Sequence, residues 1–129
     1  MFARMLACLL LGLLSFAVLL PPQPALARER APLVGDEIRF SQLPVEARET
    51  LSRIRAGTRM PYAKDGTVFG NREGMLPRRQ RGYYTEYTVA TPGARDRGAR
   101  RIIAGGDPAR TGEFYYTSDH YRSFQRIRE

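Results

Sequence analysis

Between residue 36 and the C-terminus, one helical repeat of apolar residues is followed only by short β-prone runs. The repeat has spacings of four, four and three residues, which predicts an amphipathic helix on Leu43, Ala47, Leu51 and Ile54. Pro44 suits the first turn of this helix, and Gly57 is a plausible C-terminal stop. One early helix and consecutive strands predict an α+β fold, with the helix packed on a short antiparallel β-sheet.

The β-prone runs are rich in aromatic and β-branched residues and are separated by Gly, Pro and Asp turn signals. We predict strands at residues 67–69, 83–90, 99–104, 114–117 and 123–127. No internal repeat or low-complexity tract interrupts this series, so residues 36–129 are expected to form one domain.

The N-terminal segment has the features of a secretory signal peptide. Arg4 precedes an apolar run from Met5 to Leu20, and Ala25 and Ala27 offer small residues for a signal peptidase. A membrane-spanning helix needs roughly 20 residues, which disfavours the alternative of a permanent anchor. We therefore predict a signal peptide at 1–27, a flexible leader at 28–35, secretion, and no stable membrane anchor after cleavage.

The composition limits the classes of partner and site. The formal net charge is +8, and removal of residues 1–27 would take away one basic residue and leave +7. Such a charge favours an anionic partner, which could be nucleic acid, an acidic protein or an anionic membrane. The chain has one Cys and one His, which excludes an intramolecular disulfide and a Cys- or His-rich zinc site.

Several polar residues are candidates for a catalytic or binding role, although each could also be an ordinary surface or structural residue. His120 is the only imidazole, and a lone His in a loop is usually inert. Glu86 in the middle of a strand either faces solvent or acts as a base in a polar cleft. A basic cluster consists of Arg95, Arg97, Arg100 and Arg101. It is either a solvated surface or a site that binds phosphate.

The segment that starts at Phe69 combines an aromatic ring, a turn and a carboxylate. A ring can stack on a base, and Glu73 could accept from the two adjacent N–H donors of guanine. A surface turn with a core Phe is the alternative.

Taken in order, these segments resemble the microbial guanyl-specific ribonucleases, the barnase-like family, and most closely its ribonuclease Sa branch. The resemblance is carried by residues 69–77 (FGNREGMLP), 82–89 (GYYTEYTV), 91–95 (TPGAR), 97–98, 100–103 (RRII), 115–117 and 119–121 (DHY). It extends from about residue 38 to 127. The resemblance implies the α+β microbial ribonuclease fold and cleavage of single-stranded RNA 3′ of guanosine.

The resemblance also implies roles for the reacting groups. Glu86 matches the general base that takes the proton of the ribose 2′-OH, and His120 matches the general acid that protonates the departing 5′-oxygen. Arg97 and Arg101 match the pair that neutralises the pentacoordinate phosphorus. Tyr121 matches a phosphate-contacting tyrosine.

A second set of residues matches the guanine-binding site of the family. Glu73 matches the carboxylate that reads guanine N1–H and the 2-amino group, and Phe69 matches the ring that stacks on the base. Backbone amides near Asn71 and Arg72 would bind guanine O6, and Tyr62 matches an aromatic residue at the edge of the site. Since RNA carries its own nucleophile, no metal or cofactor is implied.

The expected partner is an RNA substrate, and the resemblance adds a small acidic barstar-like inhibitor protein and a monomeric state. A rival hypothesis is a non-catalytic cationic protein that binds RNA or anionic membranes after export. A toxin that uses the same chemistry against competing cells is a third. The joint presence of Glu86, Arg97, Arg101 and His120 favours an enzyme, because binding alone does not require that set.

Overall fold

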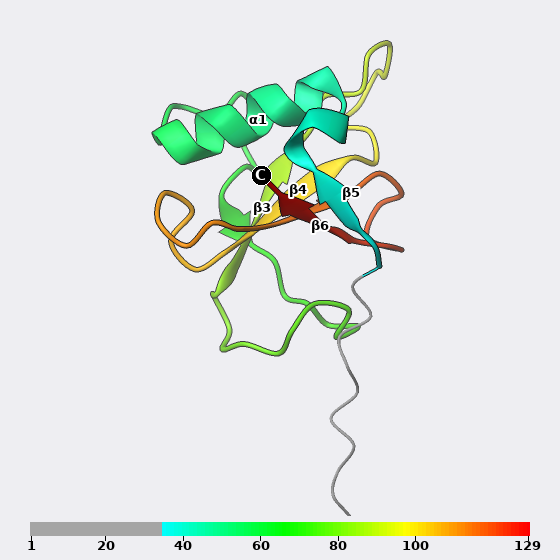
Figure 1. Ribbon diagram of the computed structural model, residues 1–129. Coiled ribbons are helices and arrows are strands. Elements are labelled where there is room, and N and C mark those ends of the chain that lie inside the picture. The colour runs from blue at the N-terminus through cyan, green and yellow to red at the C-terminus, as the bar shows by residue number, and fades with distance from the viewer. Residues whose placement is uncertain (1–34) are drawn as a thin grey trace, which may run out of the picture.

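The computed structural model describes residues 35–129, so the predicted signal peptide and nearly all of the leader lie outside the described residues. Figure 1 shows the α-helix lying above a curved sheet. The elements are β1 (Glu37–Arg39), a 3₁₀ turn (Phe40–Gln42), α1 (Val45–Ala56), β2 (Thr67–Val68), β3 (Tyr84–Thr88), β4 (Arg101–Gly105), β5 (Glu113–Thr117) and β6 (Gln125–Arg128).

The helix forms where its apolar repeat predicts it. Pro44 takes the N-cap position, one residue before the expected first turn, because its extended backbone leads into the helix. Gly57 ends the helix in the left-handed region, with φ 65°, and its N–H donates to carbonyls of the last turn. The buried stripe of α1 consists of Ala47, Thr50, Leu51 and Ile54.

The sheet has six strands in the order β1-β6-β5-β4-β3-β2. The pairs from β2 to β6 are antiparallel, which confirms the α+β prediction. The expectation of a purely antiparallel sheet needs one correction, because β1 pairs with β6 in parallel. β1 has little signal in its own residues, since Ile38 is the one apolar residue in this three-residue strand.

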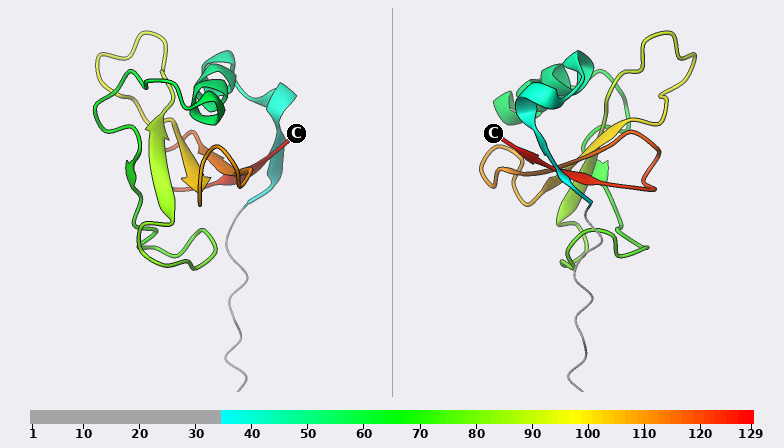
Figure 2. Two further views of the ribbon diagram at one scale, coloured as in Figure 1. Left: turned by 90° about the vertical axis from the view of Figure 1, so that its left-hand side faces the viewer. Right: turned by 45° about the vertical axis from the view of Figure 1, so that its right-hand side comes forward.

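Alternation along β3, β4 and β5 gives the sheet two different faces. One face packs against α1, as both views in Figure 2 show. This face contributes Tyr87, Ile102, Ala104, Phe114 and Tyr116 to the main core. The other face carries a smaller cluster made of Leu76, Tyr84, Ile103, Tyr115 and Phe124. The same face presents Glu86 and Arg101, so the predicted catalytic groups lie on the side of the sheet away from the helix.

Strand ends differ from the prediction by a few residues, and one difference has a clear cause. Ser123 was expected to begin the last strand, but β6 begins at Gln125. The Ser123 backbone N–H and hydroxyl both donate to the Asp119 carboxylate, at 3.0 and 2.6 Å, which holds this residue in the preceding turn. Within residues 35–129, the structure contains no helix with the length and apolarity needed to cross a membrane.

Candidate active site

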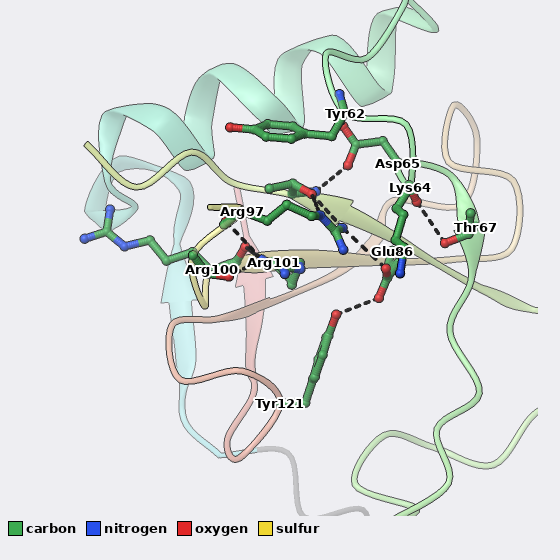
Figure 3. A network of polar contacts seen from close by, with 11 residues as sticks. Tyr62, Lys64, Asp65, Thr67, Glu86, Arg97, Arg100, Arg101 and Tyr121 are labelled. Atoms are coloured by element: carbon green, nitrogen blue, oxygen red, sulfur yellow. Dashed lines mark hydrogen bonds and ion pairs between the residues drawn. The ribbon is translucent and has the colours of Figure 1, made fainter. Parts of the chain in front are cut away.

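Glu86 lies at the centre of the open face, in the middle of β3. Its Oε2 accepts a hydrogen bond of 2.6 Å from the Tyr121 hydroxyl, and its Oε1 lies 3.4 Å from an Nη of Arg97 (Figure 3). The Glu86 side chain is 14% exposed. The carboxylate is therefore held between a hydroxyl donor and a cation and still reaches solvent.

Arg97 is aimed at Glu86 by the loop between β3 and β4. Its Nε and Nη2 both donate to the Thr88 hydroxyl, at 3.0 and 2.7 Å. The loop turns back at Gly98, whose φ is 62° and where a Cβ would come within 2.5 Å of the Thr91 hydroxyl. Glycine is required there, because a side chain would displace the segment that carries Arg97.

Arg101 is the most deeply buried cation of the site, with 3% of the residue exposed. Its Nη1 donates to the carbonyls of Gly98 and Arg100, at 2.9 and 2.8 Å, and to that of Arg97 at 3.4 Å. It forms no ion pair with any residue from 35 to 129. A buried guanidinium without a neutralising carboxylate creates a positive potential that suits an anionic ligand.

The turn after β5 presents His120 and Tyr121. Both residues have positive φ, 57° and 71°, a region that non-glycine residues seldom occupy. The Thr117 hydroxyl accepts from Tyr121 N–H at 3.1 Å, and the His120 N–H donates to the Ala99 carbonyl at 3.1 Å. The His120 ring is exposed beside the Tyr121 ring, with centroids 4.8 Å apart, so it lies at the rim of the site.

Burial, followed by the hydrogen bond to Glu86, raises the pKa of Tyr121 to about 12. Tyr121 therefore remains protonated at neutral pH and acts as a donor toward the carboxylate. The neighbouring Asp119 has its pKa held below the ordinary value, first by the hydrogen bond from the Ser123 hydroxyl.

The loop that begins at Phe69 is joined to the catalytic groups by aromatic packing. The Phe69 ring lies 5.2 Å from the Tyr121 ring and 5.9 Å from the Phe124 ring, centroid to centroid. Its N–H also donates to the Tyr84 carbonyl at 2.9 Å. The predicted base-stacking residue and the predicted phosphate-contacting tyrosine are therefore direct neighbours.

Asn71 fixes the shape of the same loop. Its side-chain amide donates to the Leu76 carbonyl at 2.9 Å and accepts from the Leu76 N–H at 3.0 Å. Because both ends of this amide are engaged in closing the loop, we expect Asn71 to meet a ligand through its backbone. Arg72 and Glu73 are exposed at the tip of the closed loop.

Tyr62 lies apart from this group. It lines a pocket of about 340 Å³ with Ile54, Met60 and Tyr87, which belong to α1, the following loop and the helix-facing side of β3. The structure therefore brings Glu86, Arg97 and Tyr121 into contact, with Phe69 packed on Tyr121. It leaves Tyr62 on the side toward the helix.

Three positioning residues were not identified from the sequence. Thr88 orients Arg97, as described above. Asp65 accepts from the Thr88 N–H at 2.7 Å and from the Tyr62 N–H at 3.2 Å, which fastens the turn before β2 to β3. Asp119 gathers donors from Thr117, Arg122 and Ser123, which holds the turn of His120. The Asp-Gly pair at 65–66 and the Asp before His120 were the available signals.

Within the described part of the chain, no group of three or more His, Cys, Asp or Glu side chains gathers in a way that could hold a metal ion. The site itself presents Arg, Tyr and His side chains and backbone N–H groups, which recognise phosphate oxygens and the polar edge of a planar base.

Comparisons with known proteins point in one direction. A protein-family model described as ribonuclease matches residues 28–128. The chain is 54% identical over 88 residues to guanyl-specific ribonuclease Sa3 of Kitasatospora aureofaciens, a match that covers 68% of this chain and 60% of that protein. It is 52% identical over 94 residues to guanyl-specific ribonuclease Sa of the same organism, covering 73% of this chain and 95% of that protein.

Solved structures agree with the sequence comparison. The fold matches ribonuclease Sa2, determined in complexes with mononucleotides, with a TM-score of 0.68 and 45% identity over 73% of this chain and 94% of that one. A second structure of ribonuclease Sa2, with guanosine-2′-cyclophosphate, matches with a TM-score of 0.67 and 44% identity, covering 73% of this chain and 97% of that one.

Proposed function

Because the chain belongs to the family of microbial guanyl-specific ribonucleases, we propose that it is an endoribonuclease that cleaves single-stranded RNA 3′ of guanosine. The observation that carries this proposal is the network on the open face, where Glu86 contacts both Arg97 and Tyr121 (Figure 3). A base, a cation and a hydroxyl donor held together suit transfer of a phosphoryl group within RNA.

The reaction begins when the Glu86 carboxylate takes the proton of the ribose 2′-OH. The 2′-oxygen then forms a bond to phosphorus while the bond from phosphorus to the 5′-oxygen breaks. His120 gives a proton to that departing oxygen. The product is a guanosine 2′,3′-cyclic phosphate end, which hydrolysis converts to the 3′-phosphate. DNA lacks the 2′-OH and cannot follow this route.

Arg97 and Arg101 neutralise the charge that develops on the pentacoordinate phosphorus. Their geometry supports this role, because each guanidinium is held by several hydrogen bonds before any ligand arrives. Preorganised charge in a partly buried site stabilises a transition state without a reorganisation cost. The Tyr121 hydroxyl contacts the phosphate from the Glu86 side.

Guanine binds at the loop from Phe69 to Glu73. Phe69 stacks on the base, the backbone amides near Asn71 and Arg72 donate to O6, and Glu73 accepts from N1–H and the 2-amino group. The hydrogen bonds between the Asn71 side chain and the Leu76 backbone support this role, since they fix the positions of the backbone N–H donors before the base binds. Any other base would leave the Glu73 carboxylate without its donors.

The remaining parts of the proposal rest on the sequence. Residues 1–27 are a signal peptide that directs secretion, residues 28–35 are a leader, and residues 36–129 are the ribonuclease domain. The protein acts as a monomer. Its positive charge suits a small acidic inhibitor protein as a partner, because complementary charge accelerates association.

The test uses the purified protein and its E73A variant on the dinucleotides GpC, ApC, CpC and UpC, with EDTA present. We expect rapid cleavage of GpC to a guanosine 2′,3′-cyclic phosphate by the native protein. E73A should lose most of its preference for GpC, because the base-reading carboxylate is gone. Product analysis by chromatography distinguishes the cyclic phosphate from the 3′-phosphate.

Other outcomes separate the hypotheses. Equal cleavage of all four dinucleotides would keep the catalytic roles and overturn the role of Glu73. A folded protein that binds RNA but cleaves none of them would contradict the proposal and favour the cationic binding protein.

A further inference from the structure

The turn that leads into β2 is fastened to the strand that carries Glu86. The Gly66 N–H donates to the Glu86 carbonyl at 2.8 Å, and Asp65 accepts from the Thr88 N–H at 2.7 Å. The carbonyl of Lys64 accepts from the Thr67 hydroxyl and N–H, at 2.8 and 3.2 Å. The backbone of Lys64 is therefore fixed relative to the catalytic strand on both sides.

Lys64 is the only lysine of the chain, and its side chain is directed at the site. Figure 3 shows it extending from the turn toward the Glu86 carboxylate, while Arg97 approaches that carboxylate from the other direction. Lys64 is exposed and forms no ion pair with the residues that the structure describes. Its three N–H donors are thus available to a ligand.

The two arginines of the site differ from Lys64 in this respect. Arg97 already donates to Thr88 and Glu86, and Nη1 of Arg101 is occupied by backbone carbonyls, while the buried Nε of Arg101 has no partner among the described residues. A phosphate on this face would find those guanidinium groups on one side of Glu86. On the other side of Glu86 lies Lys64, whose ammonium can bind a phosphate without first breaking an ion pair with a described residue.

We propose that Lys64 is a further substrate-binding residue of this enzyme, whose ammonium donates to a non-bridging oxygen of the scissile phosphate. The inference rests on the proposed function. Lys64 transfers no proton: the bond changes at phosphorus remain those of Glu86 and His120. It places positive charge on the side of the phosphate opposite Arg97, where charge increases as the 2′-oxygen attacks.

An ammonium suits this position because it is a compact charge on a flexible stem. The fixed guanidinium groups can match one arrangement of phosphate oxygens. Lys64 can follow the oxygen as phosphorus passes from four to five substituents, since the turn constrains its backbone and leaves its side chain free to move. The contribution is therefore larger in the transition state than in the bound ground state.

The test compares K64Q with K64R and with R59Q, measured as kcat and KM on GpC. Arg59 is an exposed arginine outside the site, so R59Q removes the same charge as K64Q and serves as the matched control. We expect K64Q to lower kcat by about 10-fold with a smaller change in KM, since one charged donor to the transition state is lost. K64R should retain much of the activity, and R59Q should match the native protein.

Binding of 3′-GMP and guanosine adds a readout that does not depend on turnover. K64Q should weaken binding of 3′-GMP and leave binding of guanosine unchanged, because the two ligands differ in the phosphate. A loss that appears only on longer RNA, and not on GpC, would mean that Lys64 contacts a flanking phosphate and would overturn the proposal. Native rates for K64Q on both substrates would also overturn it. If the native protein fails to cleave GpC, the proposed function itself fails.

Discussion

The two faces of the sheet are built from the same three strands and yet have opposite chemistry. On the face covered by α1, the side chains of Ile102, Ala104 and Phe114 are almost completely buried among other apolar groups. On the open face, the neighbouring positions in β3 and β4 present Glu86 and Arg101. The pleat therefore separates the residues that stabilise the fold from those that carry the proposed reaction.

The buried polar groups show the same division. Arg101, Glu113 and Thr117 belong to the open face. Arg101 and Thr117 form hydrogen bonds to the adjoining loops, and the Glu113 carboxylate accepts from Tyr115 of its own strand and from Tyr83, the residue before β3. Burying such groups contributes little net stability, because their desolvation offsets the bonds that they make. The open face is therefore held in shape for binding, while the covered face supplies the driving force for folding.

The largest expected effect comes from removing the base on the open face. We expect E86Q to lower kcat/KM on GpC by about 10²–10⁴-fold, the usual contribution of a general base. The amide keeps the shape of the side chain and can still accept from Tyr121, so the fold should be retained. Steady-state kinetics and a thermal unfolding curve measure the two quantities on the same sample.

The matched control is E49Q, an exposed glutamate of α1 on the other side of the sheet. It changes the net charge by the same amount and should leave the rate unaltered. An E86Q protein with native activity, or one that is unfolded, would break the separation of the two faces.

The next largest effect is the converse change on the covered face. Leu51 is a residue of α1 whose side chain is completely buried in the main core, and L51A should lower the free energy of unfolding by about 2–5 kcal/mol. The fraction that remains folded should cleave GpC at the native rate, since no group of the open face is altered. Urea unfolding measures the stability, and activity is assayed well below the midpoint.

V45A provides the control for L51A. Val45 lies on the same helix but is 52% exposed, so its truncation removes little buried surface. A large loss of kcat in L51A at full folding would show that the covered face also shapes the site.

The extent to which sequence predicts this molecule follows from how local each signal is. The helix and the strands β3 to β5 carry signals in their own residues, so their presence and approximate position could be predicted, although the strand ends differ by one or two residues. β1 could not, because its three residues form a strand only through pairing with β6 at the far end of the chain. The predicted start of the last strand was wrong for the same kind of reason, because the Asp119 side chain holds Ser123 in the preceding turn.

The site divides in the same way. Residue types and the family resemblance identified Glu86, Arg97 and Arg101, which the structure brings to one face, and their catalytic roles stay predictions. The contacts that orient these groups could not be predicted from the sequence, because Thr88 contacts Arg97 only after the loop has folded back at Gly98. The role of the Asn71 side chain could not be predicted either. It forms hydrogen bonds with the Leu76 backbone, and the sequence motif does not distinguish that structural role from contact with a base.

The smallest expected effect concerns Asp119, a residue of the open side that acts on stability and position. Its carboxylate accepts from Thr117, Arg122 and Ser123, and these bonds hold its pKa below the ordinary value, with the Ser123 hydroxyl as the largest cause. A lowered pKa in the folded state means that ionised Asp119 stabilises the protein above the unfolded pKa. That contribution is lost as the pH falls through the folded pKa.

We therefore expect D119N to lower Tm by about 5 °C at pH 7, and the difference from the native protein to shrink below about pH 4. D36N is the control, because Asp36 is exposed and makes no side-chain hydrogen bond or ion pair with residues 35–129. The turn held by Asp119 also sets the two positive-φ residues His120 and Tyr121, so D119N should reduce kcat more than it changes KM. A constant difference in Tm from pH 7 to pH 3 would mean that shape, and not charge, is what Asp119 supplies.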